Sequence, residues 1–209
     1  MENSRAIKVL IADDHAVVRI GLSALIGTEP DITVVGVAKD GEEAVSETLR
    51  LKPDVVVMDF MMPKKTGVEA TAEILSALPD TRIIVLTTFS ASDAIARALE
   101  LGAAGAVMKT AEDAELVSII RTVAAGGKVV SDEIRKLLAE DPPAEKLTPR
   151  QLDILKSVTQ GLTNADIAKQ FGLREQSVKE HLTAIFAKLD ASNRSEAVAI
   201  TLRKQLLKI

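Results

Sequence analysis

Short apolar runs alternate with segments of helical spacing over the first 125 residues, and this alternation restricts the fold more than any other feature of the sequence. Most residues of these runs are apolar or β-branched, as in strands that are buried on both faces. Five such runs occur, at residues 7–12, 33–38, 55–58, 83–86 and 105–108. Between them, apolar residues recur at helical spacing, as at Leu116, Ile119, Ile120 and Val123. Strands that alternate with helices predict a parallel sheet with helices on both of its faces.

The sequence changes character after residue 125, which indicates a domain boundary. Gly126-Gly127 is expected to end the last helix of the α/β domain. Residues 140–145, Glu-Asp-Pro-Pro-Ala-Glu, are charged and contain two prolines, as linkers often do. We therefore expect a domain with a five-stranded parallel sheet over residues 1–125 and a linker over residues 126–145, with room for a short polar helix at 131–139.

Residues 146–209 have the pattern of an all-α domain with four helices. Thr148-Pro149 is a typical helix start, because a capping hydroxyl is followed by proline at the first helical position. The three later helices are expected to begin near Asn164, Glu175 and Arg194. A short helix, a turn and a longer amphipathic helix have the layout of a helix-turn-helix, whose second helix enters the major groove of DNA.

Composition and charge narrow the class of protein. Apolar residues make up 47% and charged residues 27% of the chain, which is typical of a globular protein. The sequence has no cysteine, no signal-peptide pattern at its start and no apolar run near the ~18 residues of a membrane span. We therefore expect a cytoplasmic location. From Glu145 onward there are eleven basic and seven acidic residues, against 15 and 23 before it, so the two domains are expected to have different partners.

Three carboxylates, a hydroxyl and an amine are predicted to meet at one edge of the sheet. Asp13 and Asp14 follow the first strand, Asp59 follows the third, Thr87 ends the fourth and Lys109 follows the fifth. The carboxyl ends of parallel strands share one edge, where ligands bind in open α/β sheets. Carboxylates so close together repel unless a cation lies among them, and a hard divalent ion such as Mg²⁺ suits oxygen ligands. A carboxylate can also attack phosphorus to form an aspartyl-phosphate.

Each of these residues has an ordinary explanation when it is taken alone. Adjacent carboxylates at a helix start often only favour the helix dipole, an Asp after a strand is often a turn residue, and a Lys there is usually solvated. Their convergence on one edge of the sheet favours a functional site.

Four segments resemble the receiver domains of two-component response regulators, and the resemblance covers nearly all of residues 6–125. These segments are residues 9–15, 55–67, 84–88 and 102–109. The resemblance implies a flavodoxin-like fold, with a sensor histidine kinase as partner. It also implies that Asp59 accepts the phosphoryl group, that the hydroxyl of the switch residue Thr87 moves with this group, and that Lys109 bridges to it. Mg²⁺ would be held by Asp13, Asp14, Asp59 and the backbone carbonyl of Met61.

The sequence departs from the receiver pattern at the residue three positions before the lysine. Many receivers carry Tyr or Phe there, as the partner of the switch threonine, whereas this chain has Ala106, and only Phe89 could substitute. An alternative is therefore a transcription factor that works without phosphorylation and uses an atypical receiver for dimerisation. A Mg²⁺-dependent phosphohydrolase is a weaker alternative, since such enzymes usually carry an Asp where Met61 stands. Nucleotide binding is disfavoured because no G-x-G-x-x-G follows the first strand.

Residues 146–205 resemble the LuxR-type DNA-binding domain, so the whole chain has the NarL/FixJ arrangement. The motifs are residues 147–155, 161–168, 177–182 and 188–197. An amphipathic helix alone would more often have a solvated outer face. The resemblance implies a protein that binds double-stranded DNA as a homodimer on two half-sites and regulates transcription. It places Lys179, Glu180 and Thr183 against the bases. The phosphate contacts it implies come from Thr163, Asn164, Ser177, Lys188 and Arg194.

Overall fold

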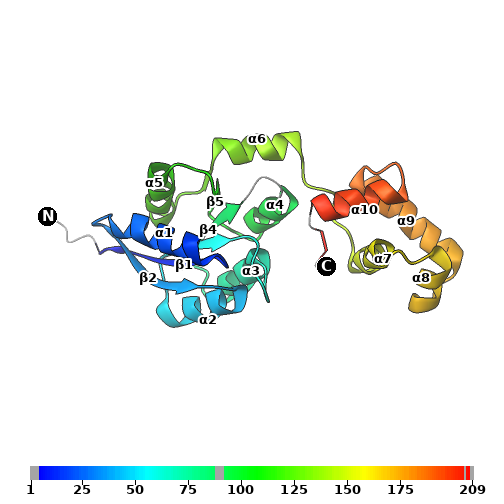
Figure 1. Ribbon diagram of the computed structural model, residues 1–209, viewed down its shortest axis with the longest axis horizontal. Coiled ribbons are helices and arrows are strands. Elements are labelled where there is room, and N and C mark those ends of the chain that lie inside the picture. The colour runs from blue at the N-terminus through cyan, green and yellow to red at the C-terminus, as the bar shows by residue number, and fades with distance from the viewer. Residues whose placement is uncertain (1–4, 88–91, 205, 208–209) are drawn as a thin grey trace. The chain divides into compact units, whose positions relative to one another are not determined.

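The chain forms two compact units, Met1–Asp141 and Pro142–Ile209 (Figure 1). The computed structural model describes residues 5–87, 92–204 and 206–207. In this part of the chain, every helix is too short or too polar to cross a lipid bilayer. The two units are considered one at a time below.

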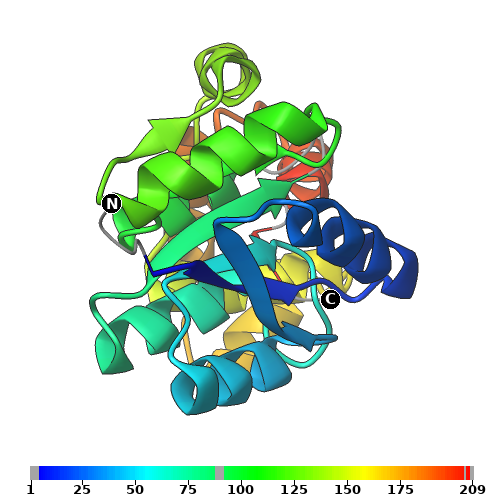
Figure 2. The same cartoon turned by 90° about the vertical axis from the view of Figure 1, so that its left-hand side faces the viewer.

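The first unit is built on a parallel sheet whose strand order is β2-β1-β3-β4-β5-β6 (Figure 2). The strands are β1 (Ile7–Ala12), β2 (Ile32–Ala38), β3 (Val55–Asp59), β4 (Arg82–Thr87), β5 (Gly105–Met108) and β6 (Val129–Val130). β3 and β5 are buried throughout, and β1 and β4 are buried after their first residues, which is why their sequences read as continuous apolar runs rather than as an alternation. The register of β1 with β2 shifts once, between Val9 and Leu10.

Alternate residues of each central strand belong to two separate cores, one on each face of the sheet. Leu10 and Val56 pack with α2 (Gly41–Leu51) and α3 (Gly67–Ala77). Val9 and Val57 pack with α1 (Ala16–Gly27) and α5 (Asp113–Ala124). Since strand side chains point alternately to the two faces, both cores follow directly from the predicted alternation of strands and helices.

The sixth strand and the helix after it extend the first unit beyond the predicted boundary. Val129-Val130 pairs with β5, and α6 (Asp132–Glu140) follows after its N-cap Ser131. Ile134 of α6 is fully buried in a cluster with Ile95 of α4 (Ser92–Glu100) and Ala106 of β5. The structure therefore differs from the expected five-stranded sheet and from the expected linker over 126–145. A two-residue strand is too short to give a periodic signal, whereas the short polar helix expected near 131–139 is present.

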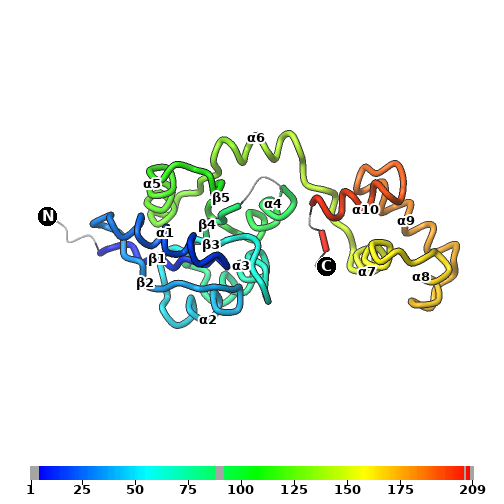
Figure 3. Tube along the Cα trace, in the orientation of Figure 1, coloured from blue at the N-terminus to red at the C-terminus, as the bar shows by residue number. Residues whose placement is uncertain are grey.

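The second unit contains the four helices expected from the sequence (Figure 3). They are α7 (Pro149–Thr159), α8 (Asn164–Phe171), α9 (Glu175–Leu189) and α10 (Arg194–Arg203). Thr148 and Thr163 each form a capping box, which explains the sharp starts of α7 and α8. The last helix ends at Arg203. One apolar core, which includes Leu155, Ile167 and Leu182, holds the four helices together.

We expect Ile134→Ala to destabilise the first unit by about 2–5 kcal/mol, since it leaves a cavity in a fully buried cluster. The free energy of unfolding of the full chain is measured by urea titration with far-UV circular dichroism. Lys136→Ala, on the exposed side of the same helix, is the control and should change stability by less than about 0.5 kcal/mol. Equal, small effects of both variants would show that α6 does not belong to the core of this unit.

Candidate functional site

An ion-pair network joins the carboxyl ends of β1, β3 and β5. Lys109 Nζ lies 2.7 Å from Asp13 Oδ2 and 2.9 Å from Asp59 Oδ2. The backbone N–H of Lys109 also donates to the carbonyl of Thr87, at the end of β4, at 2.8 Å. Asp13, Asp59 and Thr87 are all buried. The structure thus brings together four of the residues that the sequence predicted to meet at this edge of the sheet, Asp13, Asp59, Thr87 and Lys109.

Burial and charge act in opposite directions on the ionisation of this network. Burial raises the pKa of Asp59, and hydrogen bonding to Lys109 only partly offsets that rise. Burial alone would lower the pKa of Lys109, but its hydrogen bonds to Asp13 and Asp59 raise the pKa overall. Lys109 is therefore a cation at neutral pH, and it neutralises carboxylates that are almost completely buried.

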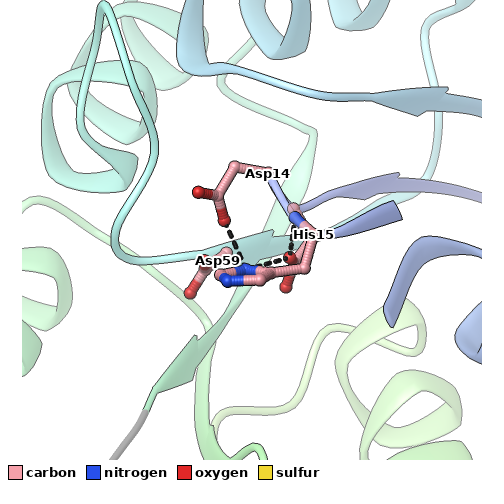
Figure 4. A group of neighbouring side chains, drawn as sticks. Asp14, His15 and Asp59 are labelled. Atoms are coloured by element: carbon pink, nitrogen blue, oxygen red, sulfur yellow. Dashed lines mark hydrogen bonds and ion pairs between the residues drawn. The ribbon is translucent and has the colours of Figure 1, made fainter. Parts of the chain in front are cut away.

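Asp14 and His15 complete the acidic end of the site (Figure 4). Ligand atoms of Asp13, Asp14, His15 and Asp59 all lie within 4.8 Å of one another. His15 Nδ1 is 2.7 Å from Asp14 Oδ1 and 3.3 Å from Asp13 Oδ1. Three carboxylates with one lysine leave an excess of negative charge, so this donor set fits a divalent cation. Sequence reasoning did not include His15, although its place directly after the acidic pair could have suggested it.

The turn after β3 packs tightly against the backbone of Asp59. The N–H of Gly67 donates to the carbonyl of Phe60 at 2.9 Å, and α3 begins there with a capping box formed by Thr66 and Glu69. A Cβ atom on Gly67 would lie 2.4 Å from the carbonyl oxygen of Asp59. Only glycine therefore allows α3 to start this close to the candidate phosphoryl acceptor.

The position of the usual switch aromatic lies inside the first unit. Ala106 is fully buried beneath α6, in the cluster that contains Ile134. Phe89, the expected substitute, lies outside the described residues.

Met61, the fourth predicted metal ligand, has an exposed side chain. Its backbone N–H lowers the pKa of Asp59 by hydrogen bonding, an effect smaller than that of burial. Its carbonyl stays a predicted metal ligand.

Helix α9 presents the candidate DNA-reading face of the second unit. Val178, Leu182, Ile185 and Leu189 are buried, whereas Lys179, Glu180 and Thr183 are exposed. Lys179 Nζ lies 3.7 Å from Glu175 Oε1, one turn earlier. Arg174 is the N-cap of this helix, and its side chain forms no capping hydrogen bond within the described residues.

Several predicted phosphate-contacting residues are hydrogen-bonded within the second unit. Arg194 donates to the side chain of Asn164 and to the carbonyl of Leu162, which joins the start of α10 to the start of α8. Lys188 Nζ donates to the carbonyl of Lys146 at 2.7 Å. The hydroxyl of Thr163 caps α8, while Ser177 is half-buried on α9. Arg194 and Lys188 therefore also stabilise the fold, a role that the sequence did not indicate.

Comparison with protein families assigns both units. The model described as "Response regulator receiver domain" matches residues 9–121, and the one described as "Bacterial regulatory proteins, luxR family" matches residues 145–201. Transcriptional regulatory protein LiaR of Bacillus subtilis (strain 168) is 39% identical over 210 residues, which cover 96% of this chain and 99% of LiaR. Response regulator protein VraR of Staphylococcus aureus (strain NCTC 8325) is 34% identical over 206 residues, or 96% of this chain and 99% of VraR.

Solved structures of other response regulators have the same fold. The response regulator ChrA of a heme-sensing two-component system superposes with a TM-score of 0.59 at 32% identity, over 97% of this chain and 99% of ChrA. A structure of two RcsB dimers bound to DNA gives a TM-score of 0.69 over 95% of this chain and 99% of RcsB. RcsB is only 23% identical, so it supports the fold alone.

We expect Gly67→Ala to destabilise the first unit by about 1–3 kcal/mol, because the new methyl group overlaps the backbone at Asp59. Gly21→Ala is the matched control. Gly21 lies within α1 with nothing within 4 Å of the added Cβ, so alanine there should stabilise by about 0.5–1 kcal/mol. Urea unfolding of both variants measures the two effects. Stabilisation by both substitutions would contradict the tight packing of the turn on Asp59.

Proposed function

The chain belongs to the response regulators that join a receiver domain to a LuxR-type DNA-binding domain, and on this basis we propose that phosphorylation of Asp59 controls its binding to specific DNA sequences. The observation that carries this proposal is the buried Asp59 carboxylate, 2.9 Å from Lys109 Nζ and beside the acidic cluster. A sensor histidine kinase is the expected phosphodonor, and a cytoplasmic location accords with this role.

The residues of the site account for each part of the phosphoryl transfer. A carboxylate oxygen of Asp59 attacks the phosphorus atom, while the bond from phosphorus to the donor's histidine nitrogen breaks and that nitrogen keeps the electron pair. Lys109, whose Nζ is 2.9 Å from Asp59 Oδ2, would neutralise charge on the phosphoryl oxygens. Mg²⁺, held by Asp13, Asp14, Asp59 and the carbonyl of Met61, would supply further neutralisation of this charge when bound.

The phosphoryl group would change the contacts of Lys109 and Thr87. Lys109 is shared between Asp13 and Asp59, so a new dianion on Asp59 competes for its ammonium. Thr87 ends β4, directly before the segment that leads to α4. We propose that a pre-existing equilibrium in the α4–β5 surface shifts in response, and that the DNA-binding unit is released or a homodimer forms.

DNA binding is assigned to α9 in the major groove. Lys179, Glu180 and Thr183 would contact bases, where Glu180 can accept a hydrogen bond from a cytosine amino group. Phosphate contacts would come from Thr163, Asn164, Ser177, Lys188 and Arg194. Two copies would bind two half-sites related by a two-fold axis.

Ala106 favours one alternative function. With a methyl group at the switch position and Ile134 packed over it, position 106 itself cannot transmit a signal through a rotating aromatic side chain. A receiver that only dimerises, in a transcription factor that works without phosphorylation, would also suit this packing.

We expect acetyl phosphate with Mg²⁺ to add one phosphoryl group to the full-length protein and none to Asp59→Asn. Intact-protein mass spectrometry measures the adduct. Binding to DNA selected from a random library, and the oligomeric state, are followed in parallel. Asp132→Asn, which removes an exposed carboxylate of α6 with a side chain 79% accessible, is the matched control and should behave as wild type. No adduct on the wild type, or DNA affinity that does not change with the adduct, would support the alternative function, and an adduct that persists in Asp59→Asn would contradict Asp59 as the acceptor.

We expect Lys179→Ala to weaken binding to the selected DNA by about 1–3 kcal/mol, which is about 5- to 150-fold. The substitution removes an exposed cation from α9 and also leaves Glu175 without its 3.7 Å partner on the same face. Fluorescence anisotropy with labelled DNA measures the affinity at fixed salt. Lys156→Ala, an equal charge change at an exposed position of α7, should have a much smaller effect. If both variants lost affinity equally, α9 would not be the reading helix.

A further inference from the structure

We propose that His15 is a nitrogen ligand of the divalent-cation site, so that the site binds borderline first-row metals such as Zn²⁺ more tightly than an oxygen-only site would. The inference rests on the cation site of the proposed function and deepens it by naming the class of metal. It is carried by the position of one atom, His15 Nδ1, which faces the carboxylates of both Asp13 and Asp14.

The spacing of the donor atoms matches the edges of a coordination polyhedron. Two ligands bound at about 2.1 Å and at right angles are about 3 Å apart, and opposite ligands are about 4.2 Å apart. His15 Nδ1 lies 2.7 Å from Asp14 Oδ1 and 3.3 Å from Asp13 Oδ1. With Asp59 included, all four ligand atoms lie within 4.8 Å of one another. Small side-chain adjustments would therefore let all four residues bind one ion.

The backbone holds His15 in this position. Its N–H donates to Asp13 Oδ1 at 2.8 Å, and its carbonyl accepts from the N–H of Arg19 at 3.1 Å in the first turn of α1. The residue is thereby fixed between the end of β1 and the start of α1. Such second contacts orient a ligand before the metal arrives and raise affinity.

The exposure of the ring permits the tautomer that metal binding needs. The side chain of His15 is 69% accessible, so water can accept a hydrogen bond from Nε2–H while the Nδ1 lone pair faces the carboxylates. Figure 4 shows the ring beside Asp59, with the Asp14 carboxylate directed at it. The competing interpretation is that Nδ1–H only donates to these carboxylates, which requires the same heavy-atom distances and no metal.

Imidazole changes the selectivity of an otherwise all-oxygen site. Mg²⁺ strongly prefers oxygen ligands and keeps several water molecules, whereas Zn²⁺ binds imidazole well. Removal of His15 should therefore weaken Zn²⁺ binding and leave Mg²⁺ binding nearly unchanged. The chain has only one other histidine, His181, and no cysteine, so few other side chains can compete for Zn²⁺.

The test compares Zn²⁺ and Mg²⁺ binding to the full-length wild type, His15→Gln and His181→Gln. Isothermal titration calorimetry measures the Zn²⁺ affinity, amide NMR shifts report Mg²⁺ binding, and ¹⁵N spectra of the two imidazoles identify the coordinating nitrogen. We expect a metal-induced shift of His15 Nδ1. We also expect Zn²⁺ affinity at least about tenfold lower in His15→Gln, unchanged Zn²⁺ affinity in His181→Gln, and Mg²⁺ affinity within about twofold in all three proteins.

Unchanged Zn²⁺ affinity in His15→Gln, with Mg²⁺ binding intact, would overturn the inference and leave the proposed function standing. The same holds if His181→Gln, rather than His15→Gln, lowers the Zn²⁺ affinity. A wild type that binds neither Zn²⁺ nor Mg²⁺ at the cluster would overturn both the inference and the cation site of the proposed function.

Discussion

The paired contacts of Lys109 are the interaction on which the site depends. One ammonium group neutralises two buried carboxylates that come from the ends of β1 and β3, and it is itself carried by the end of β5. Buried carboxylates without a partner would cost several kcal/mol each. The lysine therefore ties three strands together chemically, in addition to the hydrogen bonds of the sheet. Any group that draws Lys109 away from one of its partners changes the electrostatic balance of all three strand ends.

The sequence predicted the parts of the molecule that have strong local signals. Buried strands read as apolar runs, capping threonines mark helix starts, and the acidic residues stand directly after strands, so both domains and most of the candidate site followed from pattern and resemblance. The rest depends on tertiary contacts. Val129-Val130 forms a strand only because the edge of β5 is beside it, and the closeness of His15 to Asp59 depends on how far apart β1 and β3 lie. No local pattern contains that distance.

Ala106 of β5 and Ile134 of α6 are complementary in size, and their contact holds α6 against the sheet. The methyl group of Ala106 leaves space over β5 that Ile134 of α6 fills. The hydroxyl of Ser92, at the start of α4, also donates to Oδ2 of Asp141, just after α6, at 2.8 Å. Where many receivers carry an aromatic side chain, this chain thus has Ile134 of α6 packed on Ala106. In addition, α4 is hydrogen-bonded to Asp141, the last residue of the first unit.

The two outer strands differ in how they limit pairing with other chains. A parallel sheet has two free edges, and a long, flat edge strand is a template for aggregation. β6 contributes only two residues, too few to guide the addition of a foreign strand. β2 is longer, but its register with β1 shifts after Val9, and such irregularities distort an edge. Both edges thereby protect the first unit against association through its sheet.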